Sequence, residues 1–191
     1  MNRSIQSLIV QSWDNLSRAP RDKNHPYRLA VLSGLDAFGR PRGRTVVLRQ
    51  AERATAELYL FSDARTNKVV GLRQQNWLSW TFWHPRQSLQ TIAGGPSSLL
   101  SESERRPFFE QLSAYNWADY SSLLAPGETL EEEAKINRKA TTTDQERAWR
   151  NFCVIRTQVQ EMDILHLQRS GHQRVLAQRD GSEWKLQIVQ S

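Results

Sequence analysis

The segment from Trp77 to Trp83 constrains the fold more than any other part of the chain. It reads Trp-Leu-Ser-Trp-Thr-Phe-Trp, and aromatic and β-branched residues at this density favour a pleated, half-buried strand. Side chains alternate between the two faces of a strand, so Trp80 must face the side opposite to Trp77 and Trp83. We therefore expect one face to pack into a core and the other to meet a second subunit rather than solvent.

Other strand-type segments lie on both sides of this one, separated by turn residues. The predicted strands are Tyr27–Ser33, Gly43–Gln50, Glu57–Ser62, Ser88–Ala93, Ala148–Leu167, Arg174–Gln178 and Glu183–Val189. We expect Gly94, Gly95 and Pro96 to interrupt the strand that precedes them. The spacing of apolar residues predicts helices over Ser4–Ser17, Asn67–Gln75 and Glu102–Tyr115.

Short strands in hairpins, with two or three helices around them, predict a mainly β fold with peripheral helices, arranged as an antiparallel barrel. Neither an internal repeat nor a linker divides the chain, so we expect a single domain over residues 1–191. The segment Glu128–Thr143 is polar and is expected to be mobile, either as a lid over a site or as a tolerated loop.

Composition excludes several classes of protein. Hydrophobic residues make up 38% of the chain, which is enough for a core. No apolar run approaches the ~20 residues of a membrane helix, and Met1–Val10 lacks the apolar centre of a signal peptide. The lone Cys153 lies in an apolar run, rules out an internal disulfide and is expected to be a buried, inert thiol. Together these features predict a cytoplasmic protein.

Metal sites and several common catalytic motifs are not predicted. The histidines His25, His84, His166 and His172 form no pair with the short spacing of a metal site. The chain lacks a Gly-x-Ser-x-Gly elbow, a P-loop and a Rossmann fingerprint. His166 and His172 flank a predicted turn, so we expect them to be surface residues at a hairpin edge.

Positive charge is concentrated in the first part of the chain. The net charge is +6, and residues 1–53 carry ten Lys or Arg against four Asp or Glu. A basic chain can bind nucleic acid, an anionic membrane or a small anionic ligand. Arginines cluster at positions 40, 42, 44, 49 and 53, and a solvated surface is the alternative interpretation of this cluster.

Two motifs predict a phosphorylated ligand. The basic run Arg44-Thr-Val-Val-Leu-Arg49 precedes an apolar strand, and a polar turn then leads to Lys68 at the start of a helix. Cationic side chains near a strand edge and a helix N-terminus suit a phosphate group. In a flat strand Arg44 and Arg49 face opposite sides, so one ligand contacts both only across the strand edge or at a bulge. Ordinary surface arginines, and Thr66 as a plain helix N-cap, are the alternatives.

The order of these motifs resembles the pyridoxamine 5′-phosphate oxidase-like, FMN-binding split-barrel family. That family has an Arg-x-Val-Leu-Leu-Lys strand, a Tyr-Thr-Asn-type strand end and a Ser-Arg-Lys helix start. Their counterparts here are Arg44–Arg49, Phe61–Asp63 and Thr66–Lys68, and Arg174–Lys185 resembles the family's closing hairpin. The resemblance implies an antiparallel split β-barrel of the FMN-binding type, acting as a homodimer with FMN between the subunits.

The resemblance also implies roles for individual residues. Arg44 and Lys68 would bind the FMN phosphate, Arg49 would lie near the polar edge of the flavin ring, and Arg174 would come from the other subunit. The full set of implied cofactor-binding residues is Arg44, Val46, Val47, Leu48, Arg49, Phe61, Ser62, Thr66, Asn67, Lys68 and Arg174. The family's flavin-binding glutamine would fall within Gln87–Gln90.

The chain departs from the family pattern mainly in the substrate half of the site. The family's Arg-Pro-Arg-x-Ser stretch, which binds the substrate phosphate, has no counterpart in Ala114–Gly127, and the first arginine of its C-terminal motif is replaced by Ser170. We therefore expect an FMN-dependent oxidoreductase of a divergent branch, acting on a small molecule that can differ from pyridoxamine phosphate. The alternatives are a flavin-binding or storage protein without turnover, and a basic barrel that binds nucleic acid.

Overall fold

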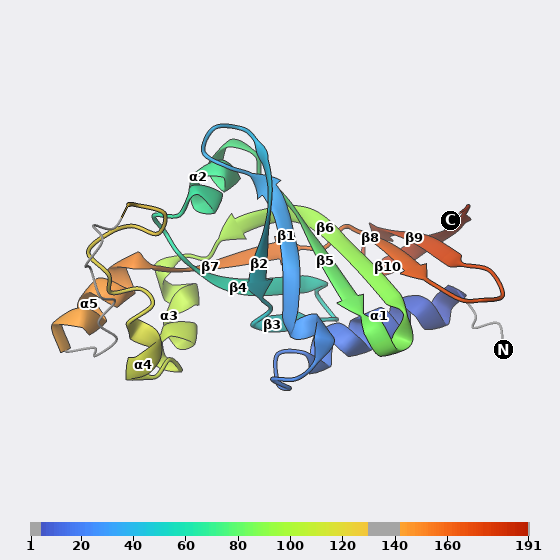
Figure 1. Cartoon of the computed structure of the whole chain (residues 1–191), viewed down its shortest axis with the longest axis horizontal. Coiled ribbons are helices and arrows are strands. Elements are labelled where there is room, and N and C mark those ends of the chain that lie inside the picture. The colour runs from blue at the N-terminus through green and yellow to red at the C-terminus, as the bar shows by residue number, and fades with distance from the viewer. Residues whose placement is uncertain (1–4, 130–141, 191) are drawn as a thin grey trace.

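The computed structural model of the chain describes residues 5–129 and 142–190 (Figure 1). Within this part, the strands are β1 (Leu29–Leu35), β2 (Pro41–Val47), β3 (Gln50–Glu52), β4 (Glu57–Asp63), β5 (Trp77–His84), β6 (Leu89–Leu99), β7 (Phe152–Gln158), β8 (Glu161–His166), β9 (Gln173–Asp180) and β10 (Glu183–Val189). The helices are α1 (Ile5–Arg18), α2 (Asn67–Gln74), α3 (Glu102–Glu110), α4 (Ala114–Trp117) and α5 (Thr142–Asn151), with the 3₁₀ turns η1 (Pro26–Arg28) and η2 (Pro85–Gln87).

The strands form one strongly curled antiparallel sheet. Neighbouring strands follow the order β10-β9-β8-β6-β5-β1-β2, and β6 also leads through β7 and β4 to β3. The corner is β6, which pairs with β8 over Leu89–Gly94 and with β7 over Ser97–Leu99. The mainly β split barrel with peripheral helices, predicted above, is confirmed.

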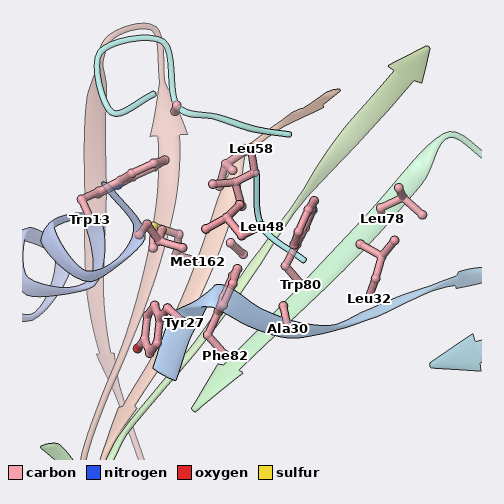
Figure 2. Packing of buried hydrophobic residues seen from close by; sticks show 14 of the residues in the cluster. Trp13, Tyr27, Ala30, Leu32, Leu48, Leu58, Leu78, Trp80, Phe82 and Met162 are labelled. Carbon is pink, nitrogen blue, oxygen red and sulfur yellow. The ribbon is translucent and has the colours of Figure 1, made fainter. Parts of the chain in front are cut away.

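The barrel core lies between the two arms of this sheet and is covered by α1. Trp13 from α1 points toward the aromatic side chains of the barrel in Figure 2. Tyr27 stacks on Phe82 at 5.0 Å between ring centroids, and Trp80 stacks on Phe82 at 6.0 Å. Burying aromatic rings of this size supplies much of the apolar contact in a small barrel.

The expected alternation along β5 is confirmed. Trp80 is fully buried, whereas Trp77 and Trp83 are 36% and 44% exposed on the outer face of the sheet. The register extends this outer face across the sheet, because paired residues of adjacent strands share a side. Val31 therefore joins it from β1 and Leu176 from β9.

A second apolar cluster packs on the opposite side of β4 and β7. Its centre is Phe152, whose ring lies 5.5 Å from Phe109 of α3 and 5.1 Å from Tyr120. The helices α3, α4 and α5 cover this cluster at the left end of Figure 1. Ser101 is the N-cap of α3 and forms a capping box with Glu104.

The predicted interruption at Gly94–Pro96 is wrong, because β6 continues through these residues to Leu99. A Cβ atom on Gly95 would overlap the carbonyl of Gln158, so glycine allows the connection after β7 to pass directly over the strand. The three residues mark the corner where β6 passes from one arm of the sheet to the other.

The predicted strand Gly43–Gln50 is divided in the structure. β2 ends at Val47 and β3 begins at Gln50. Between them, the backbone N–H of Leu48 donates to Arg28 and that of Arg49 donates to Tyr59, so the chain crosses from β1 to β4 here. The break occurs because the two halves pair with different strands.

Three other boundaries differ from prediction. The first strand begins at Leu29, after the turn η1. The helix that starts at Glu102 ends at Glu110, where the chain turns so that Trp117 of α4 can stack on Phe109. The predicted strand Ala148–Leu167 starts as the end of α5 and is then divided into β7 and β8, because these pair with different neighbours.

Some predictions fall outside the described residues. Ser4, at the start of the first predicted helix, is one, and most of the polar segment Glu128–Thr143 is another. Among the helices of residues 5–129 and 142–190, none combines the length and the apolar character needed to cross a membrane.

Candidate cofactor site

Arg44 and Lys68 line one cavity of about 420 Å³, together with Thr66 and Asn67. The cavity lies between the β1–β2 hairpin and the start of α2. Helix α2 packs tightly against the end of β1, since a Cβ on Gly71 would overlap the carbonyl of Leu35. This close packing brings the first turn of α2 to the hairpin that carries Arg44.

Lys68 is held in place by hydroxyl groups rather than by a carboxylate. Its Nζ donates to the Oγ of Ser62 at 2.6 Å and to the Oγ1 of Thr66 at 3.4 Å. Burial is the main cause that lowers the pKa of Lys68; Arg44 adds to this effect, while Cys153 and Asp63 oppose it. The positive charge of Lys68 is therefore only partly compensated by its surroundings.

The positive charge of Arg44 is likewise only partly compensated by its surroundings. Its Nη1 is buried and has no hydrogen-bond partner among the described residues. Burial also lowers the pKa of Arg44. The acidic residue of the cavity, Asp36, already accepts hydrogen bonds from the backbone of Phe38 and from Arg42. Two cations thus share a cavity in which an added anion would find unused donors.

The end of β4 is fixed by an ion pair that sequence reasoning missed. Asp63 is buried, and both of its oxygens bind the guanidinium of Arg65, at 3.0 and 2.7 Å. Arg65 also donates to the carbonyls of Ser122 and Leu123. This links the turn before α2 to the segment that places Pro126 at the cavity.

Sequence reasoning also left Arg40 and Arg42 out of the site, although both line the cavity. Their spacing could have predicted this position. Arg40, Arg42 and Arg44 occur at every second residue, so in an extended segment they share one face. The basic cluster does not form one exposed surface. Arg44 points into the cavity, Arg42 pairs with Asp36, and Arg53 pairs with Asp14.

Phe61 and Ser62 lie on opposite faces of β4, as neighbours in a strand must. Ser62 faces Lys68, whereas the ring of Phe61 lies 5.1 Å from that of Phe152 in the second cluster. The guanidinium of Arg49 lies 5.1 Å from the centroid of the Phe61 ring. The structure thus brings Arg49 and Phe61 together, but not into the cavity of Arg44 and Lys68.

The other predicted cofactor-binding residues lie in the segments that carry Arg44 and Lys68. Val46 and Val47 end β2 and are half-buried, and the side chain of Leu48 is fully buried in the barrel core. Thr66 occupies the N-cap position of α2, but its hydroxyl donates to the carbonyl of Asp63 instead of capping the helix. Asn67 is exposed at the first position of α2.

Arg174 does not lie in the Arg44–Lys68 cavity of its own chain. It extends from β9, at the right of Figure 1, while α2 is at the upper left. Asp163 binds its guanidinium through two contacts of 2.9 and 2.6 Å. Gln90 and Leu165 lie in the same row across the outer face of the sheet. Of the candidate glutamines, Gln90 therefore shares this face with Arg174, whereas Gln87 binds Asn15 elsewhere.

Cys153 is buried beneath this site. It pairs in register with Ser62, and burial raises the pKa of its thiol to about 11. A thiol in this state is an apolar packing group rather than a nucleophile, as its sequence context predicts.

Comparison with known proteins agrees with this geometry. Residues 10–99 match the model of a protein family described as pyridoxamine 5′-phosphate oxidase, FMN-binding domain. The fold is also that of a pyridoxamine 5′-phosphate oxidase-related, FMN-binding protein from Nostoc punctiforme PCC 73102, at a TM-score of 0.72 and 21% identity over 95% of this chain and 96% of that one. Residues 10–99 therefore resemble this FMN-binding family, and the chain has the split-barrel fold. The resemblance predicted from its motifs is confirmed.

Two further solved structures share the fold of this split-barrel protein. PhzG from Burkholderia lata 383, in complex with tetrahydrophenazine-1-carboxylic acid, has a TM-score of 0.73 and 17% identity, covering 96% of this chain and 91% of that one. A Clostridium acetobutylicum protein related to general stress protein 26 has a TM-score of 0.60 and 8% identity, covering 95% of this chain and 100% of that one. A search of curated proteins finds no significant sequence match.

The family match covers most of the predicted site of this split-barrel protein. It ends at Leu99, so it includes every predicted residue from Arg44 to Lys68 but not Arg174.

Proposed function

We propose that this protein binds FMN through its phosphate, with Arg44 and Lys68 as the principal ligands. The observation that carries the proposal is the buried Nη1 of Arg44, which has no partner among the described residues and shares a cavity with Lys68. Burying a cation without a counter-charge costs free energy, and a dianionic phosphate would recover it. The donor set therefore fits the phosphate end of FMN.

The other end of the cofactor would lie toward Arg49 and Phe61. Val46 and Val47 lead there from the cavity. Both pair with β1, and this pairing ends at Val47. Arg49 would hold a positive charge near the flavin ring, which favours negative charge developing there. Bound FMN supplies hydride and electron transfer, while the protein orients it and tunes its electrostatics.

We further propose that the protein works as a homodimer. Support comes from the outer face of the sheet, where Leu29 is 55% and Val31 45% exposed near Trp83. Contiguous apolar exposure of this kind is typical of a protein interface. Arg174 and Gln90 lie on the same face, so in a dimer they can reach the flavin of the partner subunit.

For the reaction, we propose oxidation or reduction of a small molecule other than pyridoxamine phosphate. The segment Ala114–Gly127 contains no Lys or Arg, so it offers no cation for a substrate phosphate. The same observation favours a second candidate, a flavin-binding protein without turnover of its own. Steady-state assays with a panel of amines and reduced nicotinamides separate the two, because any robust turnover rejects storage alone.

The cofactor is tested by an absorbance spectrum of the protein purified without added FMN, repeated after FMN is added and the sample is desalted. We expect flavin bands in at least the second spectrum, in proportion to protein. A protein that stays colourless after loading contradicts the assignment of the Arg44–Lys68 cavity as an FMN site.

A further inference from the structure

A second cavity lies beneath the C-terminal end of α1, and it shares no lining residue with the cofactor site. Its charged lining residues include Asp14 and Asp22 as well as two arginines. Its volume is about 580 Å³, and its walls include Arg18, Arg21, His25 and His84. These residues come from α1, from the loop after it and from the end of β5. In Figure 1, α1, the loop after it and the end of β5 lie near the lower edge of the molecule.

The backbone determines where each histidine carries its proton. The Nδ1 of His25 accepts a hydrogen bond from the N–H of Tyr27 at 3.1 Å, and the Nδ1 of His84 accepts one from the N–H of Gln87 at 3.2 Å. In the neutral state both rings therefore carry the proton on Nε2. The two rings are 5.8 Å apart and nearly perpendicular, so they form a pair of N–H donors at one site.

This tautomer disfavours a metal ion. A metal bound at Nε2 would require the proton on Nδ1, where it would face the N–H of Tyr27 or Gln87. In addition, residues 5–129 and 142–190 contain no group of three or more His, Cys, Asp or Glu placed to hold a metal. Donors that point outward instead suit an anion.

The charges around the cavity are mixed, because Arg18 and Arg21 line it together with Asp14 and Asp22. Arg18 and Arg21 are exposed, and no ion pair of either is found within the described residues. The nearby acids are engaged, because Asp14 pairs with Arg53 and Asp22 accepts from the backbone of Asn24. The end of α1 adds a partial negative charge of about half a unit. The two carboxylates offset the two guanidinium groups while the imidazoles are neutral, so the cavity becomes net positive when the imidazoles gain protons.

A buried polar network holds the histidine pair in position. Asn15 donates to Gln87 at 2.8 Å, and the hydroxyl groups of Tyr27 and Thr91 are 2.8 Å apart. Tyr27 and Thr91 are fully buried. The site is thus organised before any ligand binds, which reduces the entropy lost on binding.

We propose that this cavity binds a tetrahedral oxyanion, namely the phosphate group of a small phosphorylated molecule. Two imidazole N–H groups and two guanidinium groups offer several donors to the three or more oxygens of such a group. The cavity is many times larger than the ~30 Å³ of one water, so an organic group attached to the phosphate has room. A phosphate ester is therefore expected to bind more tightly than the free ion.

Protonation of the imidazoles couples to this binding. Burial lowers the pKa of His25, with His84 and Arg18 adding to the effect and Asp22 opposing it. Burial also lowers the pKa of His84; a hydrogen bond to its own backbone opposes this effect, and Arg86 adds to it. Asp14 and Arg21 complete the charged groups around the pair. An anion in the cavity would raise both pKa values, so binding takes up protons and strengthens as the pH falls.

The test is an NMR titration that follows the imidazole nitrogens of His25 and His84, assigned with His25→Gln and His84→Gln. Glycerol 3-phosphate, inorganic phosphate and sulfate are the probes, and sulfate keeps its charge over the whole pH range. We expect saturable shifts at these two histidines and not at His172, with the ester binding most tightly. Sulfate should bind more tightly at about pH 6 than at about pH 8.

Matched charge removals complete the test. Arg18→Ala with Arg21→Ala should weaken binding about tenfold or more, whereas Arg150→Ala with Arg169→Ala, which removes two exposed cations elsewhere, should not. Four outcomes overturn the proposal: no shift at saturating probe, equal shifts at His172, equal weakening by the control pair, or an affinity for sulfate that does not change with pH. Free phosphate binding as tightly as the ester would overturn the assignment to a phosphorylated molecule.

Discussion

The cofactor cavity and the cavity beneath α1 differ in the cationic groups that line them. In the cofactor cavity, Arg44 and Lys68 are partly buried, and burial lowers the pKa of both. In the cavity beneath α1, the guanidinium groups of Arg18 and Arg21 are exposed, and the groups nearest the protein interior are the titratable imidazoles of His25 and His84.

This difference predicts different behaviour toward anions. Buried cations without counter-charges store an unfavourable free energy, so a ligand that neutralises them is retained tightly. Exposed guanidinium groups lose little on being left free, and neutral imidazoles attract an anion only when they gain protons. The cofactor cavity therefore suits a cofactor that stays bound. The cavity beneath α1 suits a ligand whose affinity changes with pH.

The largest effect is expected from removing both cations of the cofactor cavity. Arg44→Ala with Lys68→Ala removes two charge-assisted contacts of roughly 1.5–3 kcal/mol each, so FMN affinity should fall by about a hundredfold or more. Fluorescence titration with FMN measures the change, and thermal unfolding checks that the fold is intact. The control, Arg73→Ala with Arg169→Ala, removes the same charge from exposed positions. A double variant that still purifies yellow would contradict the site assignment.

A smaller effect is expected from Arg174, which is held by Asp163 on the outer face of the sheet. Arg174→Ala should weaken FMN binding about tenfold if it contacts the flavin of the partner subunit. Mixing this variant with the Arg44→Ala, Lys68→Ala protein tests the geometry, because a mixed dimer contains one intact site. Partial recovery of FMN binding on mixing is expected. No recovery after demonstrated subunit exchange would show that Arg174 does not act across the interface.

The histidine pair should make stability depend on pH. The pKa values of His25 and His84 are lowered from 6.5 in the folded protein, so the unfolded chain binds protons first as the pH falls. Stability is therefore complete above about pH 7 and is lost as the pH falls through the unfolded value toward the folded ones. We expect the Tm to drop by a few degrees over this window, measured by calorimetry without added anions.

Substitution separates this effect from acid denaturation in general. His25→Gln with His84→Gln should flatten the drop, whereas His166→Gln with His172→Gln should leave it in place. The carboxyl groups of Asp36 and Glu104, whose pKa values are lowered, lose their contribution only at more acidic pH. An unchanged drop in the first double variant would assign the pH dependence to other groups.

The smallest effect is expected on folding stability, from removing the buried positive charge of Lys68. Lys68→Met removes a desolvated cation while keeping most of the side-chain volume, so the protein without FMN should gain up to about 1 kcal/mol in stability as it loses cofactor affinity. Arg21→Ala, which removes an exposed cation, should change stability by less than about 0.5 kcal/mol. Chemical denaturation measures both. A clear loss of stability in Lys68→Met would mean that its hydrogen bonds to Ser62 and Thr66 outweigh the cost of burial.

Much of the candidate site could be predicted from short motifs. Arg44, Thr66, Asn67 and Lys68 do meet in one cavity, because a strand and the start of a helix are each specified by nearby residues. Two features of that site could not be predicted. The contacts of Arg65 with the carbonyl groups of Ser122 and Leu123 join segments far apart in the sequence. The separation of Arg49 from the cavity depends on where the chain passes from β1 to β4.

The sequence by itself determined local properties: which face of β5 carries Trp80, that a helix begins at Glu102, and that Cys153 is buried. These follow from the period of a strand or helix and from capping, which involve residues a few positions apart. Only the tertiary structure decided that β6 passes through Gly95 to join both arms of the sheet, and that His25 and His84 meet beneath α1. Such contacts depend on how segments distant in the sequence pack, and no local sequence pattern specifies which segments will pack together.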